Sequence, residues 1–389
     1  MEWKEVRLGD IVSIKSGLAY KGAFIGKGEN ILLGMGCVSF KDKFLFSGAR
    51  PYEADCDDKY CVEPGDIVLA TRQQSDNLPI LAMPAIIPPS LKAPKIIYGT
   101  NLYKVENHSE VTNDFLFWQL KTPNYIDYIS SVKTGSVVRM VTKKNVEDYV
   151  FRCPPKEVRD RISKLLWGLD RKIELNNKIN ADLEEMAQAI FKNWLSECSD
   201  DVTIGELSLN ITNYEKTDAE EVVLINSSDV TEGYFDHHNY SPNKNLKGHF
   251  KKRFQKGDIL YSQVRPRNRH WAYCNFDAND YLASTQLMVI RNNPSLITSI
   301  LLYQYIISDN VWKEFTLKTE TRSGTFPQGN YEDLSQIRVP YNSDVEGISN
   351  QLETLYAKMF MLEKENSRLS TLRDTLLPRL MSGEIEVPE

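Results

Sequence analysis

The chain has 389 residues, of which 41% are hydrophobic and 26% charged, and its formal net charge is −6. These values are typical of a soluble folded protein of two or three domains and exclude a disordered or fibrous chain. No apolar run approaches the ~20 residues that a membrane-spanning helix needs. Because the N-terminus has no apolar signal segment, we expect a cytoplasmic protein without a membrane partner.

The cysteines and histidines indicate no metal site. The six cysteines form no C-x-x-C pair, and the only histidine cluster, His237-His238, has no cysteine or histidine at zinc-ligand spacing. We therefore expect reduced, mostly buried thiols and a polar histidine loop.

Residues 1–155 have the pattern of a compact α+β domain. Pro64-Gly65-Asp66-Ile67 predicts a turn that leads into a half-buried strand, and residues 115–120 predict a short buried helix. Arginine can bridge two acceptors of guanine and glutamine can bridge adenine, so polar loops after such strands are candidates for DNA contacts. The candidates in this domain are Arg72, Gln73, Gln74, Lys133, Ser136, Arg139 and Lys143.

Residues 156–195 predict a long helix. Apolar positions alternate four and three residues apart from Ile162 onward, as in a coiled-coil seam. Pro154-Pro155 directly before this segment suits helix entry. Two asparagines, Asn176 and Asn180, interrupt the seam, and a seam asparagine typically specifies register at a cost in stability.

Residues 196–342 repeat the first domain in the same order. The repeated markers are Leu8-Gly9-Asp10 with Ile204-Gly205-Glu206, 64–69 with 256–261, Thr100-Asn101-Leu102 with Thr285-Gln286-Leu287, and Thr134-Gly135-Ser136 with Ser323-Gly324-Thr325. Loops of different length separate these markers, as in two copies that share a scaffold. The candidate DNA contacts in this copy are Lys251, Lys252, Arg253, Gln263, Arg265, Arg267, Arg269, Arg322 and Ser323.

Residues 343–389 predict a second heptad helix and a tail. Ser343 to Glu346 has the spacing of a capping box at the start, and Pro378 is expected to end or kink the helix. Asn366 corresponds to Asn180 in the repeat, so we interpret both as residues that fix the helix register.

The two helices are expected to pair with each other in one chain; a dimer through the same seam is the alternative. Forty helical residues span about 60 Å. Antiparallel pairing would place two pseudo-twofold-related domains at opposite ends of an intramolecular coiled coil. Such a molecule suits a DNA target of two separated parts, because the spacing of the half-sites then follows from the protein.

Signatures of catalysis are weak. Residues 22–28 have the wrong spacing for a phosphate-binding loop, and no Asn-Pro-Pro-Tyr or Asp-Pro-Pro-Tyr tetrad of an amino-methyltransferase occurs. Asp57-Asp58-Lys59 has a nuclease-like D-x-K without the upstream Pro-Asp. Two alternatives to a DNA-binding subunit stay open: a stand-alone nuclease that uses Asp57 and Lys59, and a coiled-coil scaffold without DNA specificity.

The chain resembles the specificity (S) subunits of Type I restriction–modification systems. The resemblance rests on the opening around Val6-Arg7-Leu8-Gly9-Asp10, the repeated Gly-Asp-Ile strands, the Pro-Pro helix entry and the ending Leu376-Leu377-Pro378-Arg379-Leu380. It implies two target recognition domains, at residues 1–155 and 196–342. It also implies a central spacer helix at residues 156–195, and a distal spacer helix with a C-terminal tail at residues 343–389.

The same resemblance implies the partners. Two methyltransferase (M) subunits would carry S-adenosylmethionine and methylate adenine, and restriction (R) subunits would supply ATP- and Mg²⁺-dependent translocation and cleavage. The S chain itself would be non-catalytic and would hold no cofactor. Because recognition domains vary widely in this family, base-contacting residues cannot be transferred from it, and the loop candidates rest on residue chemistry alone.

Overall fold

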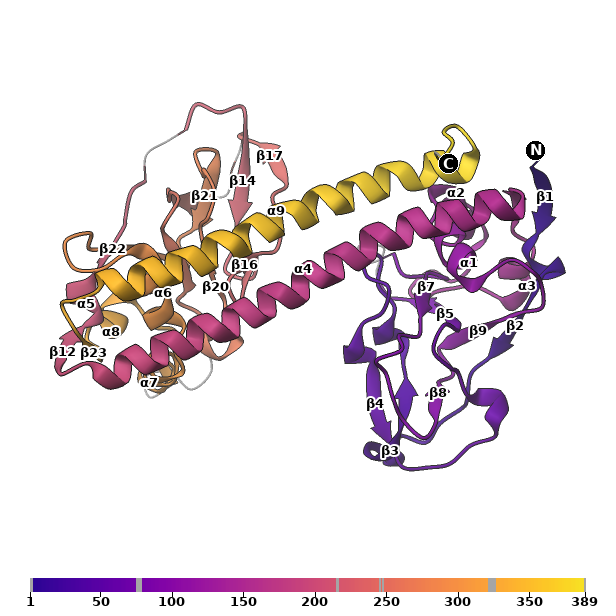
Figure 1. Cartoon of the computed structure of the whole chain (residues 1–389), viewed down its shortest axis with the longest axis horizontal. Coiled ribbons are helices and arrows are strands. Elements are labelled where there is room, and N and C mark those ends of the chain that lie inside the picture. Colours follow the sequence, from indigo (N-terminus) through magenta and orange to yellow (C-terminus); the bar gives the residue numbers. More distant parts are fainter. Residues whose placement is uncertain are drawn as a thin grey trace. The chain divides into compact units, whose positions relative to one another are not determined.

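The computed structural model describes residues 3–74, 79–214, 217–244, 246, 248–320 and 327–387. The chain divides into two compact units, the first formed by Met1–Glu174 with Asn366–Glu389 and the second by Leu175–Glu365. The long helices α4 (Lys156–Glu197) and α9 (Glu346–Ser382) each contribute one half to each unit (Figure 1). The predicted α+β class is confirmed, with α4 between two sheet-rich domains. No helix among the described residues is long and apolar enough to cross a membrane.

The first unit is built on an antiparallel sheet of four strands. Their order is β2 (Val12–Ser16), β9 (Leu102–Asn107), β5 (Ile67–Ala70) and β7 (Pro84–Ile86). A second sheet has the order β4 (Ala49–Tyr52), β3 (Ile25–Leu33) and β8 (Ile96–Tyr98), in which β3 and β8 are parallel. The pairs β1 (Lys4–Arg7) with β11 (Val150–Cys153) and β6 (Arg72–Gln73) with β10 (Arg139–Met140) complete the strands. The short helices are α1 (Asn113–Gln119), α2 (Pro123–Val132) and α3 (Lys143–Glu147).

The second unit repeats this topology. Its first sheet has the order β13 (Ser208–Asn210), β22 (Leu287–Asn292), β19 (Ile259–Ser262) and β20 (Trp271–Tyr273). Its second has the order β17 (Tyr240–Pro242), β14 (Glu221–Ile225), β21 (Tyr281–Ser284) and β18 (Phe250–Lys252), with β14 and β21 parallel. Two pairs remain, β12 (Asp200–Thr203) with β23 (Arg338–Tyr341) and β15 (Val230–Thr231) with β16 (Tyr234–Phe235). The helices are α5 (Ile204–Leu207), α6 (Ser299–Ile307), α7 (Asp309–Glu320) and α8 (Tyr331–Ser335).

The Gly-Asp turn before β5 and β19 has the same geometry in both units. Gly65 and Gly257 adopt φ of +90° and +92°, a region that L-residues rarely enter. The carboxylates of Asp66 and Asp258 accept the backbone N–H three residues earlier, at 2.9 and 2.8 Å. The sequence motif therefore encodes a specific turn, and the predicted repeat is confirmed at this level.

Each of these aspartates also holds a cation from the neighbouring strand. Lys104 of β9 lies 2.8 Å from Asp66, and Arg291 of β22 lies 2.7 Å from Asp258. The Asp258 side chain is buried, so its pair with Arg291 replaces water that the carboxylate has lost. The two ion pairs fix the central strands of each sheet to one another.

The long helices pack antiparallel inside each unit. In the first, Ile162 of α4 shares a buried core with Leu377 and Leu380 of α9. In the second, the contacts run in opposite directions along the two helices: Asn176 bonds to Glu365, and Glu184 accepts from Tyr356. The heptad positions of the sequence thus form a buried seam in both units.

The ends of α9 differ from the prediction. Ser349 donates its backbone N–H to the Val345 carbonyl at 2.9 Å, which makes Val345 the N-cap residue of α9. The predicted capping box at Ser343 is therefore not the start of the helix. Pro378 lies inside the helix, which continues to Ser382. Burial of the neighbouring apolar residues in the core offsets the missing N–H of this proline. The helix ends instead at Gly383, with φ +77°, in a Schellman motif.

Candidate nucleic-acid interface

Two loops that the sequence marks separately meet in the first unit. We call residues 71–74 and 133–140 the first loop pair. β6 follows β5 directly and pairs antiparallel with β10, with Arg139 opposite Gln73 and Met140 opposite Arg72. Gly135, at φ +90°, closes the tip of the second loop, and Arg139 donates to its carbonyl at 2.5 Å. The sequence did not predict this pairing, because it joins segments more than sixty residues apart.

The candidate residues of the first loop pair occupy different environments. Arg72, Gln74 and Ser136 are exposed, as is Lys143 at the start of α3, while Lys133 and Arg139 are half-buried. Gln73 is buried, and its side-chain oxygen accepts the Leu81 N–H at 3.1 Å. This structural role of Gln73 is at odds with the predicted base contact. The exposed members form a polar and basic edge that a nucleic acid can reach.

The second unit has an equivalent arrangement, the second loop pair, formed by residues 263–269 and 327–329. It follows β19, as the first pair follows β5. Val264 bridges to Gln328, and Arg265 donates its N–H to the Pro327 carbonyl at 3.0 Å. Arg322 and Ser323, two of the predicted contacts, lie outside the described residues. The half-buried Gln263 accepts the Gly329 N–H on its backbone carbonyl at 2.9 Å.

Two arginines of this loop have left-handed backbones. Arg265 and Arg269 have φ of +49° and +53° and flank the 3-10 turn η6 (Pro266–Asn268). A non-glycine residue in this region costs about 1–2 kcal/mol, so the surrounding structure must hold it. Trp312 does so by donating its indole N–H to the Pro266 carbonyl at 2.9 Å. Backbone strain of this kind concentrates at functional sites.

The side chains of the three loop arginines differ. Arg265 is exposed. Arg267 forms an ion pair with Glu320, which raises the pKa of the guanidinium. Arg269 lies 4.3 Å over the Trp312 ring and 3.4 Å from Asp309. The predicted DNA contacts at Arg267 and Arg269 therefore require those acidic partners to be exchanged for phosphate or base.

The basic run on β18 is divided by strand alternation. Lys251 is exposed, but Lys252 is buried and donates to the Leu287 carbonyl at 2.6 Å. Burial lowers the pKa of the Lys252 ammonium. Arg253 donates to the Asn279 carbonyl. A phosphate contact at Lys252 is thus incompatible with its position, because Lys252 shares the inward face of the strand.

The helix asparagines lie where the heptads predicted, but their partners were not foreseen. Asn180 is 7% exposed and donates to the Met359 carbonyl at 3.4 Å. Asn176 is fully buried and donates to Glu365 at 2.7 Å. Asn366 is half-buried. The hydrogen bonds of these two side-chain amides therefore join α4 to α9 within one unit. The register role of Asn180 and Asn366 stays a prediction.

The nuclease-like motif forms surface ion pairs. Lys59 lies 3.0 Å from Asp57, and Lys95 reaches Asp55 and Asp58 at 2.8 and 3.0 Å, with the three aspartates exposed. Within the described residues, no group of three histidine, cysteine or acidic side chains is placed to hold a metal ion.

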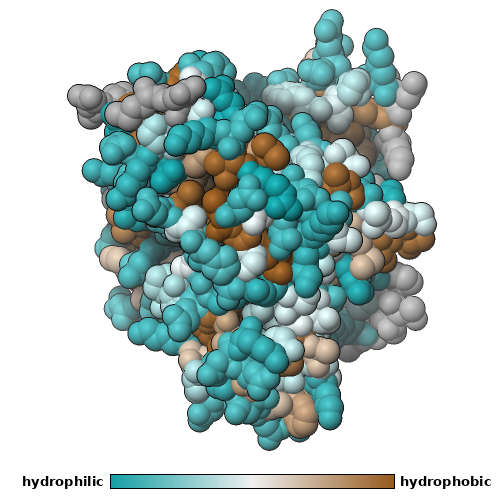
Figure 2. Space-filling view, turned by 90° about the vertical axis from the view of Figure 1, so that its right-hand side faces the viewer, coloured by the Kyte–Doolittle hydropathy of each residue, from teal (hydrophilic) through white to brown (hydrophobic). Residues whose placement is uncertain are grey.

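Apolar side chains also reach the surface. Figure 2 shows a largely hydrophilic face with apolar side chains gathered in its middle (Figure 2). Large exposed apolar residues of the first unit include Val137, Met140 and Val150, of which the first two belong to the first loop pair. That loop pair therefore presents apolar as well as polar atoms, and the methyl group of thymine is a partner for such atoms in DNA grooves.

Comparisons with known proteins relate the first half of the chain to one family. A family model described as the Type I restriction modification DNA specificity domain matches residues 1–185. The chain is 32% identical over 177 residues to the specificity subunit of the Type I restriction enzyme HindI from Haemophilus influenzae. The first 185 residues, just under half of the chain, are thus similar to the specificity subunits of Type I restriction–modification systems. That alignment covers 45% of this chain and 39% of the HindI subunit, so the match spans less than half of either protein.

Two longer matches cover both units. The chain is 21% identical over 309 residues to the specificity subunit of Type I enzyme MjaIX from Methanocaldococcus jannaschii, covering 72% of this chain and 70% of the relative. The crystal structure of a Type I S subunit from M. genitalium covers 98% of this chain and 96% of its own, with a TM-score of 0.54 and 14% identity. The latter likeness concerns the fold alone.

Proposed function

We propose that this chain is the specificity subunit of a Type I restriction–modification system, that it binds double-stranded DNA, and that each unit reads one half of a bipartite target. The observation that carries the proposal is the duplicated loop pair. In each unit an arginine-containing loop leaves the strand after the Gly-Asp turn and pairs with a second loop from late in the domain. Two such surfaces on one chain suit two half-sites.

The side chains at the loop pairs suit the major groove. Exposed arginines such as Arg72 and Arg265 reach guanine O6 and N7, and Gln74 reaches adenine, with each bidentate contact discriminating by about 1–3 kcal/mol. Lys143 and Lys251 are exposed and suit phosphate contacts, which position the protein without reading sequence.

The long helices are proposed to set the gap between half-sites and to dock the M subunits. Four large apolar side chains on these helices are about half exposed, namely Leu175, Met186, Met361 and Leu372. These four side chains are the candidates for contacts in that docking surface. Inserting one heptad into each helix should change the gap and leave both half-sites intact. A change in both half-sites would contradict this role.

Catalysis is assigned to the partners. In the proposal, two M subunits carry S-adenosylmethionine and methylate adenine, and R subunits, where present, use ATP and Mg²⁺. This chain then contributes recognition and assembly only. Cleavage of DNA by the purified chain with Mg²⁺ or Mn²⁺, abolished by Lys59→Ala, would favour the nuclease alternative instead.

The test is methylation mapping in cells that express the chain with its M partner. Arg72→Ala should relax one half of the methylated motif, and Arg265→Ala the other half, while Lys4→Ala, which removes an exposed lysine of β1, should leave the motif unchanged. A single uninterrupted motif would refute bipartite reading. If both arginine variants left the motif and the salt dependence of DNA affinity unchanged, the scaffold alternative would stand.

A further inference from the structure

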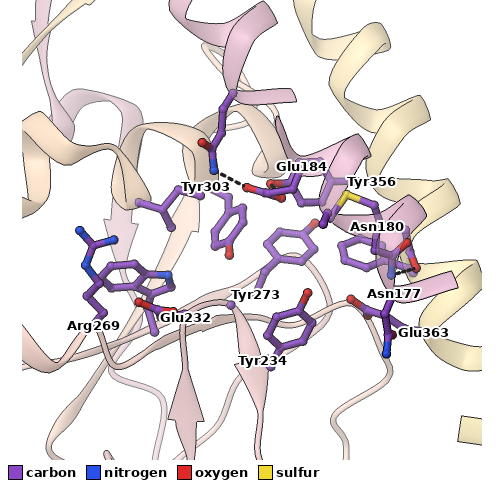
Figure 3. Close-up of a pocket in the computed structure, with 17 residues that line it drawn as sticks. Asn177, Asn180, Glu184, Glu232, Tyr234, Arg269, Tyr273, Tyr303, Tyr356 and Glu363 are labelled. Atoms are coloured by element: carbon purple, nitrogen blue, oxygen red, sulfur yellow. Dashed lines mark hydrogen bonds between the residues drawn. The ribbon is translucent and has the colours of Figure 1, made fainter. Parts of the chain in front are cut away.

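The second unit contains a cavity of about 470 Å³ beside the paired helices. Figure 3 shows its residues converging from α4, α6, α9, β20 and the β15–β16 hairpin (Figure 3). All of them belong to one unit. The lining residues used below are Asn180, Glu184, Tyr273, Tyr303, Tyr356 and Glu363.

The cavity wall combines carboxylates with aromatic rings. Glu184 accepts from the Tyr356 hydroxyl at 3.0 Å, and Glu363 accepts from the Asn275 amide at 3.3 Å. Tyr273 stacks on Phe360 with ring centroids 5.6 Å apart. Desolvation, with the nearby charge of Glu184, raises the pKa of Glu363 to about 7. Such a wall favours a positive charge over a negative or neutral one.

A buried acceptor in the same wall lacks a donor. Asn180 is 7% exposed and spends its amide N–H on the Met359 carbonyl, whereas its Oδ1 has no hydrogen-bond partner among the described residues. An unsatisfied buried acceptor costs about 1–3 kcal/mol. A ligand N–H donor that reached the Asn180 Oδ1 would relieve that cost.

The first unit shows what occupies the equivalent place. The two copies are related by a constant shift of 186 residues here: the capping threonines Thr112 and Thr298 correspond, as do the buried Ile162 and Ile348. By this relation, Lys121 corresponds to Ile307, which lines the cavity.

Internal cations fill that place in the first unit. The Lys121 ammonium lies 5.2 Å over the Phe117 ring and donates to the Asp42 carbonyl at 3.0 Å. Arg373 donates to Asp170 at 2.6 Å, and Lys43 lies 3.7 Å from the same carboxylate. An aromatic and acidic site is thus occupied by the chain's own cations.

The second unit also has aromatic and acidic residues at this place, but it lacks those cations. Its acids stand at other positions: Asp170 corresponds to Tyr356, and Glu184 and Glu363 correspond to Ser370 and Asn177. The shift of 186 places Ile307 and Ala187 where the first unit has Lys121 and Arg373, and Tyr303 where it has Phe117. Arg269 is the one cation among the described residues lining the cavity, and its charge is engaged by Asp309 and Trp312. Figure 3 places Arg269 at the opposite side from Glu363.

We propose that this cavity binds an organic cation from outside the chain, an alkylammonium or guanidinium group on a flexible aliphatic stem. The stem lies against Tyr273, Tyr303 and Phe360, and the charged head lies between Glu184 and Glu363. The cation comes either from a free polyamine or from a lysine or arginine side chain of a partner subunit. This proposal does not depend on DNA reading by the loop pairs.

The test measures binding to the full chain by calorimetry, with spermidine and N-acetyl-arginine amide as probes and N-acetyl-glutamate as the anionic control. We expect the two cations to bind and the anion not to bind. Glu363→Gln and Glu184→Gln should each weaken binding about tenfold or more, because each removes a charge-assisted hydrogen bond. Glu353→Gln, on an exposed part of α9, should leave binding unchanged.

Binding should also strengthen as pH rises through about 7, because Glu363 then ionises. The other titratable groups that line the cavity are Glu184, Glu232, Arg269 and the tyrosines Tyr234, Tyr273, Tyr303 and Tyr356. The tyrosine pKa values are raised by burial, so the phenols stay neutral over this range. Repeating the titration with the assembled M complex identifies the source: loss of probe binding indicates a partner side chain, and retention a free polyamine.

Absence of cation binding at millimolar probe concentration in the free chain would overturn the proposal. Equal affinity of wild type, Glu363→Gln and Glu184→Gln would do so as well. Hydrogen exchange of the second unit in both variants establishes that they are folded, so a loss of binding reports on the site itself.

Discussion

Replacing Glu363 by glutamine should stabilise the second unit. The gain should appear only at pH values at which this glutamate is ionised in the unfolded chain. The pKa of Glu363 rises from its ordinary value of 4.5 to about 7 through desolvation, with a further contribution from Glu184. A folded-state pKa above the unfolded one means that the folded state binds the proton more tightly. Stability is therefore lost as pH rises from about 4.5 to about 7, and the full loss persists above that.

The magnitude follows from the pKa. A tenfold change in proton affinity is worth about 1.4 kcal/mol, so the ionised Glu363 costs the second unit about 3 kcal/mol above pH ~7. Glutamine keeps the acceptor for the Asn275 amide and removes the charge. Glu363→Gln should then be about 2–3 kcal/mol more stable than wild type near pH ~8.5 and nearly equal to it near pH ~4.5.

The assay is urea unfolding over a pH series, followed by hydrogen exchange of peptides from residues 346–365. Peptide resolution matters because the two units need not unfold together, and a single transition is then undefined. Glu353→Gln is the matched control on the same helix and should show no pH-dependent difference. A Glu363→Gln variant that is less stable than wild type by the same amount at every pH would refute the reasoning, because it would show a structural role for the carboxylate.

Three further predictions concern stability and DNA binding. Asp258→Ala should destabilise the second unit by about 3–5 kcal/mol in urea unfolding, because it leaves Arg291 and a turn N–H without their buried partner. Asp66→Ala should cost the first unit less, since that pair is about one-fifth exposed, and an equal cost would contradict the burial argument. Lys251→Ala should weaken salt-dependent DNA affinity of the assembled complex, whereas Lys252→Met should not; a loss with the latter in a folded protein would show that Lys252 leaves its buried position on binding.

Local turn chemistry made much of the fold predictable from the sequence. The Gly-Asp turn needs a positive φ at Gly65 and Gly257 and a carboxylate one residue later, so its residues are visible in the sequence and mark both copies. The heptad seam is equally local, because its period decides which side chains are buried. These signals fixed the repeat, the strands that follow each turn and the two long helices.

The parts that could not be predicted depend on contacts between distant residues. The pairing of β6 with β10 turns Gln73 inward, and no local signal distinguishes it from its exposed neighbours. Pro378 stays helical because its neighbours Leu377 and Leu380 pack into the hydrophobic core of the first unit. The other members of that core come mostly from the distant segment between Leu8 and Leu166. Lys252 is an exception, because neighbouring side chains of a strand point to opposite faces. Assigning Phe250 to Lys252 as a strand from the sequence would have placed Lys252 on the buried face and Lys251 on the exposed one.

The two units differ in the charged groups beside the paired helices. Their frames share the Gly-Asp turn, the aspartate ion pair and the capped helix before the long helix. Beside the paired helices, however, the first unit places Lys121 and Arg373 against its own rings and carboxylates, and the second leaves Glu184 and Glu363 facing a cavity. Two interchangeable binding surfaces would carry the same charge at equivalent positions. The unequal charge instead predicts that a cationic partner group distinguishes the second unit from the first.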